Sequence, residues 1–139
     1  MSWQQLIKQF ETNPKSLFLI DGFGAIVSAF LLGIVWVKFE KTIGIPASTL
    51  YFLAMLPLLF AIYDCYCYGK EIKKTTALLK AIAVANILYC FLSLGCAFYH
   101  FKTITYFGYI YIIIEILIIL VLARIELKVA QKLKRTAIE

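Results

Sequence analysis

The sequence predicts an all-α, polytopic membrane protein: an antiparallel four-transmembrane-helix bundle with a short N-terminal amphipathic interfacial helix. Hydrophobic residues make up 63% of its 139 positions, which is well above the share of roughly one half found in soluble domains. They gather in four segments, 17–37, 48–68, 78–99 and 104–125, each close to the about 20 residues that a helix needs to cross the bilayer core. The segments lack the in-out alternation of barrel strands, so helices are the structure that satisfies their backbone groups in lipid.

Local patterns justify each element in chain order. In the opening arm, apolar residues at positions 3, 6, 7 and 10 recur at helical spacing with Gln and Lys between them, which predicts an amphipathic helix lying on the membrane surface. The connections between the four apolar segments are short, so segments adjacent in sequence are expected to pack as antiparallel neighbours. The fourth helix is expected to continue beyond the membrane as ARIELKVAQKLKRTA. With no repeat and no second domain in the pattern, residues 1–139 are expected to form one domain.

The basic residues predict the orientation of the bundle. Eleven of the 14 Lys and Arg residues lie in the N-terminal arm, the middle connection and the C-terminal tail, whereas the other two connections hold only Lys38, Lys41 and Lys102. Because Lys and Arg concentrate in cytoplasmic segments, both termini are expected in the cytoplasm. The net charge of +6 is therefore interpreted as a signal of topology, with membrane lipids as partners of the basic tail, and not as a sign of nucleic-acid binding.

Polar side chains interrupt the apolar segments at positions that predict a cavity. Asp21 and Asp64 each lie about four residues, or roughly 6 Å, inside the cytoplasmic ends of the first two segments. The third segment carries a polar stripe along one helix face, and Glu115 lies near the middle of the fourth. Their depths in the membrane, counted along each segment, predict a polar cavity in the cytoplasmic half of the bundle. The candidate residues for binding a substrate or an ion are Asp21, Ser28, Asp64, Asn86, Tyr89 and Glu115.

The embedded acids have no embedded basic partners, because no Lys or Arg lies at comparable depth in the four segments. A charged side chain at the centre of a membrane helix costs about 2.5 to 3.5 kcal/mol on insertion scales. Glu115 is therefore expected either to be protonated or to meet a cation or polar donors from a ligand or a neighbour. Asp21 and Asp64 also fit a purely interfacial position within reach of headgroups and water, and Asn86 also fits a simple interhelical hydrogen bond.

The cysteines and the single histidine predict neither a metal site nor a cofactor. Cys65 and Cys67 lie two residues apart, so they face different sides of a helix, and they are interpreted as small apolar residues. His100 follows Cys96 by one helical turn. Two possible ligands fall short of the three or four protein ligands that a zinc site uses.

Two motifs carry a resemblance to other proteins. FLIDGFGA in the first segment and FAIYDCYCY in the second resemble small uncharacterised four-span integral membrane proteins of bacteria. The resemblance covers about half of the chain and implies a multi-pass protein of the bacterial inner membrane, without implying an activity. Small multidrug transporters share the size and an acid in the first helix, but in that family the acid lies deep in the helix, whereas Asp21 is shallow.

Three functions stay open at this level. Embedded acids without bases favour a protein that binds or transports a small cationic or amphiphilic solute, or couples to protons, as a homo-oligomer because four helices enclose little space. Asp21 and Asp64 at headgroup depth suggest instead a membrane enzyme acting on a lipid or isoprenoid, with the two acids as general acid and base or as ligands of a divalent ion. The polar stripe and the small residues of the first segment also fit an accessory or structural subunit that docks on a partner membrane protein.

Overall fold

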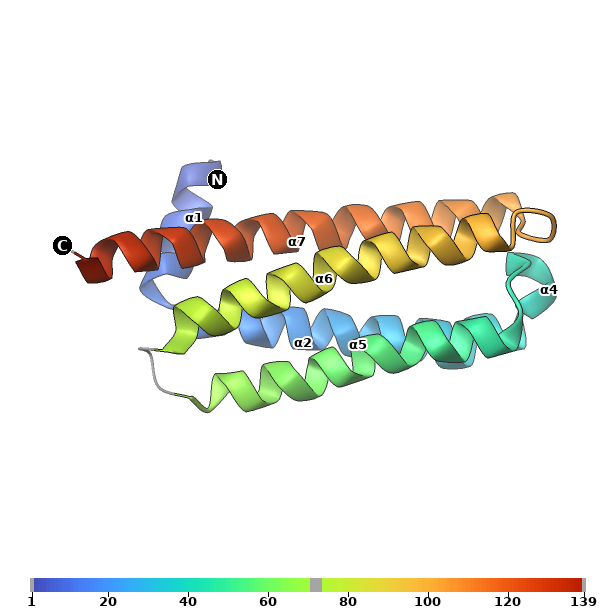
Figure 1. Cartoon of the computed structure of the whole chain (residues 1–139), viewed down its shortest axis with the longest axis horizontal. Coiled ribbons are helices and arrows are strands. Elements are labelled where there is room, and N and C mark those ends of the chain that lie inside the picture. Colours follow the sequence, from blue (N-terminus) through green and yellow to red (C-terminus); the bar gives the residue numbers. More distant parts are fainter. Residues whose placement is uncertain (1, 71–73, 139) are drawn as a thin grey trace.

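The computed structural model describes residues 2–70 and 74–138, and every regular element in these ranges is helical. Figure 1 shows long helices lying side by side along one axis. In chain order the elements are α1 (Trp3–Thr12), α2 (Lys15–Phe30), the π-helix η1 (Leu31–Val35), α3 (Trp36–Lys38), α4 (Glu40–Ile43), α5 (Ala47–Tyr68), α6 (Thr75–Tyr99) and α7 (Tyr106–Ile138).

Three helical stretches within the described residues are long and apolar enough to cross a membrane. They are Lys15–Lys38, which joins α2, η1 and α3, then Ala47–Tyr68 and Thr75–Tyr99. These stretches contain the first three apolar segments of the sequence and indicate a membrane protein. The fourth segment, 104–125, falls mostly within the 33-residue helix α7, and its crossing of the membrane stays a prediction.

The N-terminal arm is helical, and α1 is docked on α7. A capping box opens the helix: the Gln5 backbone N–H donates to the Ser2 hydroxyl, and the Ser2 backbone N–H donates to the Gln5 side chain. Ile7 is buried at 2% exposure, and the Arg124 guanidinium of α7 lies 5.6 Å from the Trp3 ring centroid. The placement of α1 at a membrane surface stays a prediction.

The long helices pack as two pairs. α2 lies along α5, and α6 lies along α7, with fewer contacts between the pairs than within them. Close approach of α2 and η1 to α5 depends on glycine. A Cβ at Gly22 of α2 would lie 3.3 Å from the Asp64 Cβ, and one at Gly33 of η1 would lie 3.2 Å from the Ala54 Cβ. The two chain ends lie at the same end of the molecule (Figure 1).

Two apolar cores hold the pairs together, one toward each end of the molecule. The core nearer the chain ends buries Ile7, Leu17, Phe18, Cys67, Leu79, Ile82, Ile125, Val129 and Ala130. The core toward the α4 end buries Leu32, Ile43, Ile45, Leu50, Leu53, Ala54, Tyr89, Cys90, Ala97, Ile112 and Ile116.

Beyond the second core, the chain around α4 meets the start of α7 in a contact that we call the α4–α7 joint. The Thr105 N–H donates to the Ile43 carbonyl at 3.1 Å, and the Thr105 hydroxyl donates to the Thr42 carbonyl. Gly44 has a φ of 77°, in the left-handed region that glycine adopts without steric cost. Gly108 packs against the Ile43 carbonyl and the Ile104 side chain with no space for a Cβ. We therefore expect the joint to set the distance between the two helix pairs at this end.

Candidate functional site

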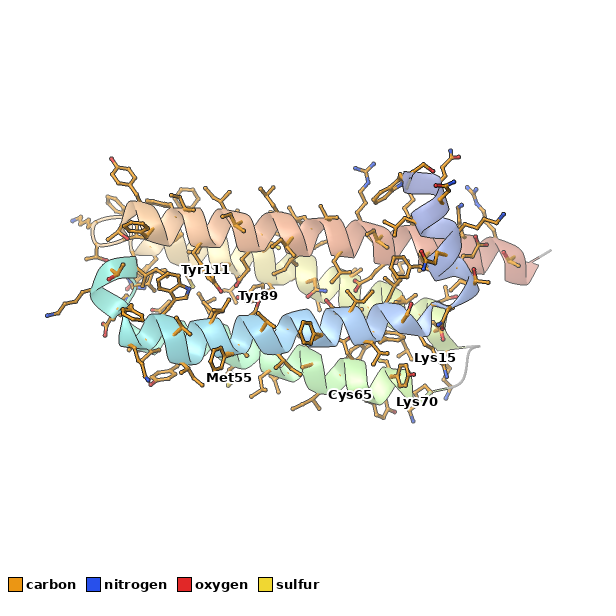
Figure 2. The ribbon with its side chains drawn as sticks, turned by 180° about the vertical axis from the view of Figure 1, so that it is seen from behind. Lys15, Met55, Cys65, Lys70, Tyr89 and Tyr111 are labelled. Carbon is orange, nitrogen blue, oxygen red and sulfur yellow. The ribbon has the colours of Figure 1, made fainter. Side chains whose placement is uncertain are left out.

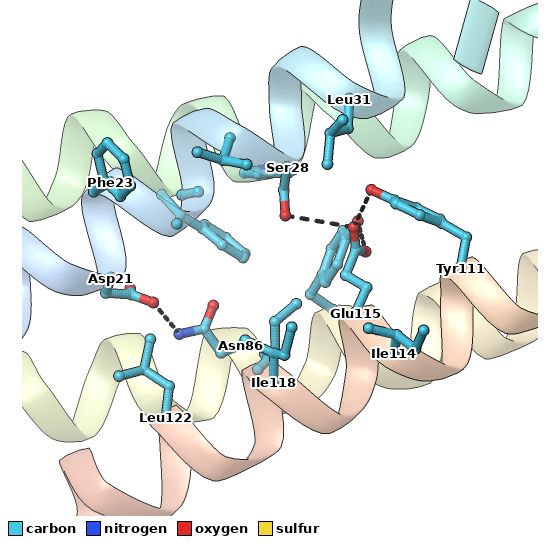
Figure 3. A pocket seen from close by; sticks show the side chains of 17 residues that line it. Asp21, Phe23, Ser28, Leu31, Asn86, Tyr111, Ile114, Glu115, Ile118 and Leu122 are labelled. Atoms are coloured by element: carbon cyan, nitrogen blue, oxygen red, sulfur yellow. Dashed lines mark hydrogen bonds between the residues drawn. The ribbon is translucent and has the colours of Figure 1, made fainter. Parts of the chain in front are cut away.

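A cavity of about 350 Å³ lies between the two helix pairs and is lined by residues of α2, η1, α5, α6 and α7. Five of the six candidate residues line it: Asp21, Ser28, Asn86, Tyr89 and Glu115. The remaining lining residues are Tyr111 and an apolar set, namely Phe23, Gly24, Ala25, Val27, Leu31, Pro57, Phe60, Ile114, Ile118, Ile119 and Leu122. Figure 3 shows that the polar groups collect at two ends of this cavity, with apolar walls between them.

Glu115 occupies the end of the cavity near the middle of α7, and hydroxyl groups surround its carboxylate. The Tyr89 hydroxyl donates to Oε1 at 2.8 Å, and the Tyr111 hydroxyl donates to Oε2 at 2.7 Å. The Ser28 hydroxyl lies 3.4 Å from Oε2, a long contact (Figure 3). These donors come from α6, α7 and α2, so the carboxylate links three helices across both pairs.

Aromatic packing holds the two tyrosines in place. Tyr111 lies one helical turn before Glu115 on the same face of α7, and the Trp36 ring packs against it edge-on with centroids 5.4 Å apart. Phe60 of α5 packs in the same manner on Tyr89 at 6.2 Å. Figure 2 shows both tyrosines pointing into the space between the helix pairs. Their hydroxyls are thereby aimed at the carboxylate in advance of any ligand.

The opposite end of the cavity holds Asp21 and Asn86. The Asn86 side-chain amide donates to Asp21 Oδ1 at 3.1 Å, and both residues are buried. Asp21 lies seven residues before Ser28 on α2, which places it about 10 Å from the Glu115 end along the helix axis. Asp21 is 5% exposed, so the protein itself covers it, in contrast to an interfacial side chain that reaches headgroups and water.

Asp64 does not line the cavity, although the sequence groups it with the other candidates. It lies on α5 at 1% exposure, where Gly22, the neighbour of Asp21, allows α2 to pack against its side chain. Within the described residues, neither of its carboxylate oxygens has a hydrogen-bond partner.

Glu126 is a buried acid that the sequence reasoning missed. It is 0% exposed, and both of its carboxylate oxygens lack a hydrogen-bond partner within the described ranges. The sequence pattern predicts that the segment around it is a basic extension of the fourth helix. One signal was available, because Glu126 follows Glu115 by eleven residues, which is close to three full helical turns and puts both acids on the same face of α7.

The buried charges are all of one sign. Among the residues that the structure describes, the buried charged residue types are Asp21, Asp64, Glu115 and Glu126, and no Lys, Arg or His is buried. The cavity lining likewise contains no basic residue within this part of the chain. The interior therefore carries an excess of acidic groups that only hydroxyls and one amide are seen to solvate.

The rim of the cavity lies between α2 and α7. Phe23 and Val27 of α2 and Ile114 and Ile118 of α7 line the cavity and are also exposed on the outside of the molecule, at 41 to 71%. An apolar route thus connects the cavity with the surface that lipid chains would cover if these helices span the membrane.

The histidine and the cysteines lie apart from this cavity. His100 Nε2 is 2.9 Å from the Thr49 hydroxyl, outside the cavity lining. The four cysteines are free thiols, and among the described residues no group of three or more His, Cys, Asp and Glu side chains has an arrangement that could hold a metal ion.

Comparison of the chain with models of protein families, with curated proteins and with solved structures found no match. The function must therefore be inferred from the geometry of the cavity and of the buried acids.

Proposed function

We propose that this protein is an integral membrane protein that binds a small amphiphilic cation in its cavity and carries it across the membrane. The observation behind the proposal is the Glu115 carboxylate: it is 7% exposed, it faces a cavity, and it has hydroxyl donors but no basic partner among the described residues. A buried carboxylate is costly unless a positive charge or a proton balances it. A ligand with an ammonium group would supply that charge.

The cavity walls define the rest of the ligand. Between the polar ends the lining is apolar, so a short alkyl or aryl body fits beside the ammonium group. The volume of about 350 Å³ lies at the lower end of the range for small-molecule sites. The exposed rim between α2 and α7 gives such an amphiphile an entry route from the lipid side, which a strongly hydrated solute would not use.

The proposed arrangement in the membrane has four spans, with 104–125 of α7 as the fourth and α1 at the interface. An even number of spans agrees with the two chain ends lying at one end of the molecule. The distribution of Lys and Arg favours a cytoplasmic position for that end, in the bacterial inner membrane. Four helices enclose little space, so carriage across the membrane calls for a homo-oligomer or a partner membrane protein.

Binding of octylammonium to the protein in lipid nanodiscs tests the proposal, with octanol as the neutral analogue. Glu115→Gln keeps the shape of the side chain but removes its charge. Hydrogen bonds to charged groups contribute about 1.5 to 3 kcal/mol, so this variant is expected to lose roughly ten- to a hundred-fold in octylammonium affinity. Glu40→Gln removes the same charge from the exposed helix α4 and is the matched control, with unchanged affinity.

Trp36 provides the signal, because it packs on Tyr111 beside Glu115. A Trp3→Phe background leaves Trp36 as the remaining tryptophan of the chain. Equal binding of octanol and octylammonium, or no effect of Glu115→Gln, would show that the cavity does not select a cation. Absence of binding together with stoichiometric copurification of another membrane protein would favour the accessory-subunit function instead.

A further inference from the structure

Three buried carboxylates from three different helices form a second acidic group at the Asp21 end of the cavity. Asp21 of α2, Asp64 of α5 and Glu126 of α7 lie at the level of one apolar core, because their near neighbours in sequence, Phe18, Cys67 and Ile125, are buried together in it. A Cβ at Gly22, next to Asp21, would lie 3.3 Å from the Asp64 Cβ. We call this set the carboxyl triad. Its members are exposed by 5%, 1% and 0%, respectively.

The triad is almost without hydrogen-bond donors. Five of its six carboxylate oxygens have no partner among the described residues, and the sixth, Asp21 Oδ1, accepts from Asn86. Charged hydrogen-bonding groups that are buried without partners are rare in folded proteins because each one costs several kcal/mol. Glu126 is fully buried, and the one amide near it, that of Asn86, donates to Asp21 Oδ1.

The surrounding titratable groups do not supply a positive charge. Tyr63 and Cys67 on α5 face this region, and the Tyr63 hydroxyl already donates to the Leu78 carbonyl of α6. Lys70, close to Cys67, lies over the Tyr66 ring at 4.2 Å instead of reaching the triad. Within the described residues, α2 and α7 contribute the triad members Asp21 and Glu126 themselves, and α6 contributes the neutral Asn86. None of these neighbours supplies a positive charge that would balance the negative charge of the triad.

From this geometry we propose that Asp21, Asp64 and Glu126 form a proton-binding site, in which the carboxyl groups share protons so that they are not all ionised together. Like charges placed side by side titrate as one coupled unit. A proton needs no coordination space, which suits Asp64 and Glu126 because neither lines the cavity. Asp21 does line the cavity, so its ionised or protonated state affects both the other two carboxyl groups and a ligand in the cavity.

One consequence rests on the proposed function. When a cation enters the cavity, its charge favours ionised Asp21, and the triad releases a proton. Binding would then exchange one positive charge for another in the protein interior, without a net change of buried charge. Such an exchange is the basis of proton-coupled transport.

Infrared spectroscopy of the ligand-free protein tests the proton site without reference to any ligand. Protonated carboxyl groups give a C=O stretching band that ionised carboxylates lack. The wild type is expected to show this band at neutral pH, and Glu126→Gln and Asp64→Asn each to weaken it, whereas Glu40→Gln leaves it unchanged. A band that neither triad variant alters would overturn the proposal.

Labelling with dicyclohexylcarbodiimide, which reacts with protonated carboxyl groups in apolar surroundings, gives an independent readout by mass spectrometry in case a variant folds poorly. Wild-type labelling is expected at a triad residue and is expected to fall as the pH rises. Protection by sodium but not by choline would show that the site holds a metal cation and would overturn the proton assignment.

Proton release on addition of octylammonium to weakly buffered protein tests the coupling separately. A triad that carries protons but releases none on ligand binding would leave the proton site intact and refute the coupling. No binding of octylammonium at all, beside a positive infrared result, would refute the proposed cavity function alone.

Discussion

Replacing Gly108 by Ala tests whether the α4–α7 joint sets the distance between the two helix pairs. A Cβ at position 108 would lie 2.6 Å from Ile104 Cγ1 and closer still to the Ile43 carbonyl oxygen, where ordinary contacts begin at 3.4 Å. The Ile43 backbone would have to move by about 1 Å, at an overpacking cost of about 1 to 3 kcal/mol. That movement also weakens the hydrogen bond from Thr105 to Ile43, which contributes about 1 kcal/mol.

Gly95→Ala is the matched control on α6, because a Cβ at position 95 meets no atom within 4 Å. Alanine raises helix propensity by up to about 1 kcal/mol, and comparing two Gly→Ala changes largely removes this term. We expect Gly108→Ala to be less stable than Gly95→Ala by about 2 to 4 kcal/mol in dodecyl sulfate unfolding titrations from mixed micelles. Coincident unfolding midpoints for the two variants would refute the role of the joint.

Three further predictions concern the site and its supports. Tyr89→Phe removes the 2.8 Å hydrogen bond to Glu115 and is expected to lower the free energy of unfolding by about 1 to 2 kcal/mol in the same titration. Ser28→Ala removes a contact of 3.4 Å and is expected to lower it by under about 0.5 kcal/mol, so equal effects would contradict the site geometry. Ile7→Ala leaves a cavity in the core under α1 and is expected to lower the free energy of unfolding by about 2 to 4 kcal/mol. It is also expected to speed tryptic cleavage of the N-terminal arm, whereas truncation of an exposed isoleucine is not. Cys65 is exposed and is expected to be the first cysteine to react with N-ethylmaleimide in detergent, as measured by peptide mass spectrometry (Figure 2). Faster reaction of the buried Cys67 would contradict the orientation of α5 about its own axis.

Much of the candidate site follows from sequence because helix periodicity is a local property. Asn86 and Tyr89 lie three residues apart, so any helix through them presents both side chains to one neighbour. The hydrogen-bond partners of these side chains do not follow from residue spacing. Tyr111 shares a face with Glu115 in sequence, yet its role as a donor became evident only when its hydroxyl was found 2.7 Å from the carboxylate.

The division of the acids into two groups depends on tertiary structure. The sequence groups Asp64 with the cavity residues because it lies at a similar membrane depth, and it places Glu126 in the basic C-terminal extension. In the structure, Gly22 lets α2 pack against the Asp64 side chain. Glu126 is buried because its neighbour Ile125 packs in the core formed with α2, α5 and α6. The depth of a residue along a helix follows from counting, but its distance from an acid on another helix depends on how both helices are rotated and paired.

The sequence by itself determined the chemical character of the protein: apolar helices long enough to cross lipid, and acids within them that lack basic partners. These properties are set by the transfer free energies of single side chains and by local spacing, which need no knowledge of neighbours. Only the tertiary structure decided that Glu115 is held by tyrosines from two helices, that Asp64 and Glu126 both adjoin Asp21, and that the cavity reaches the outer surface between α2 and α7. Those outcomes depend on side-chain packing between segments far apart in the chain, which residue spacing does not specify.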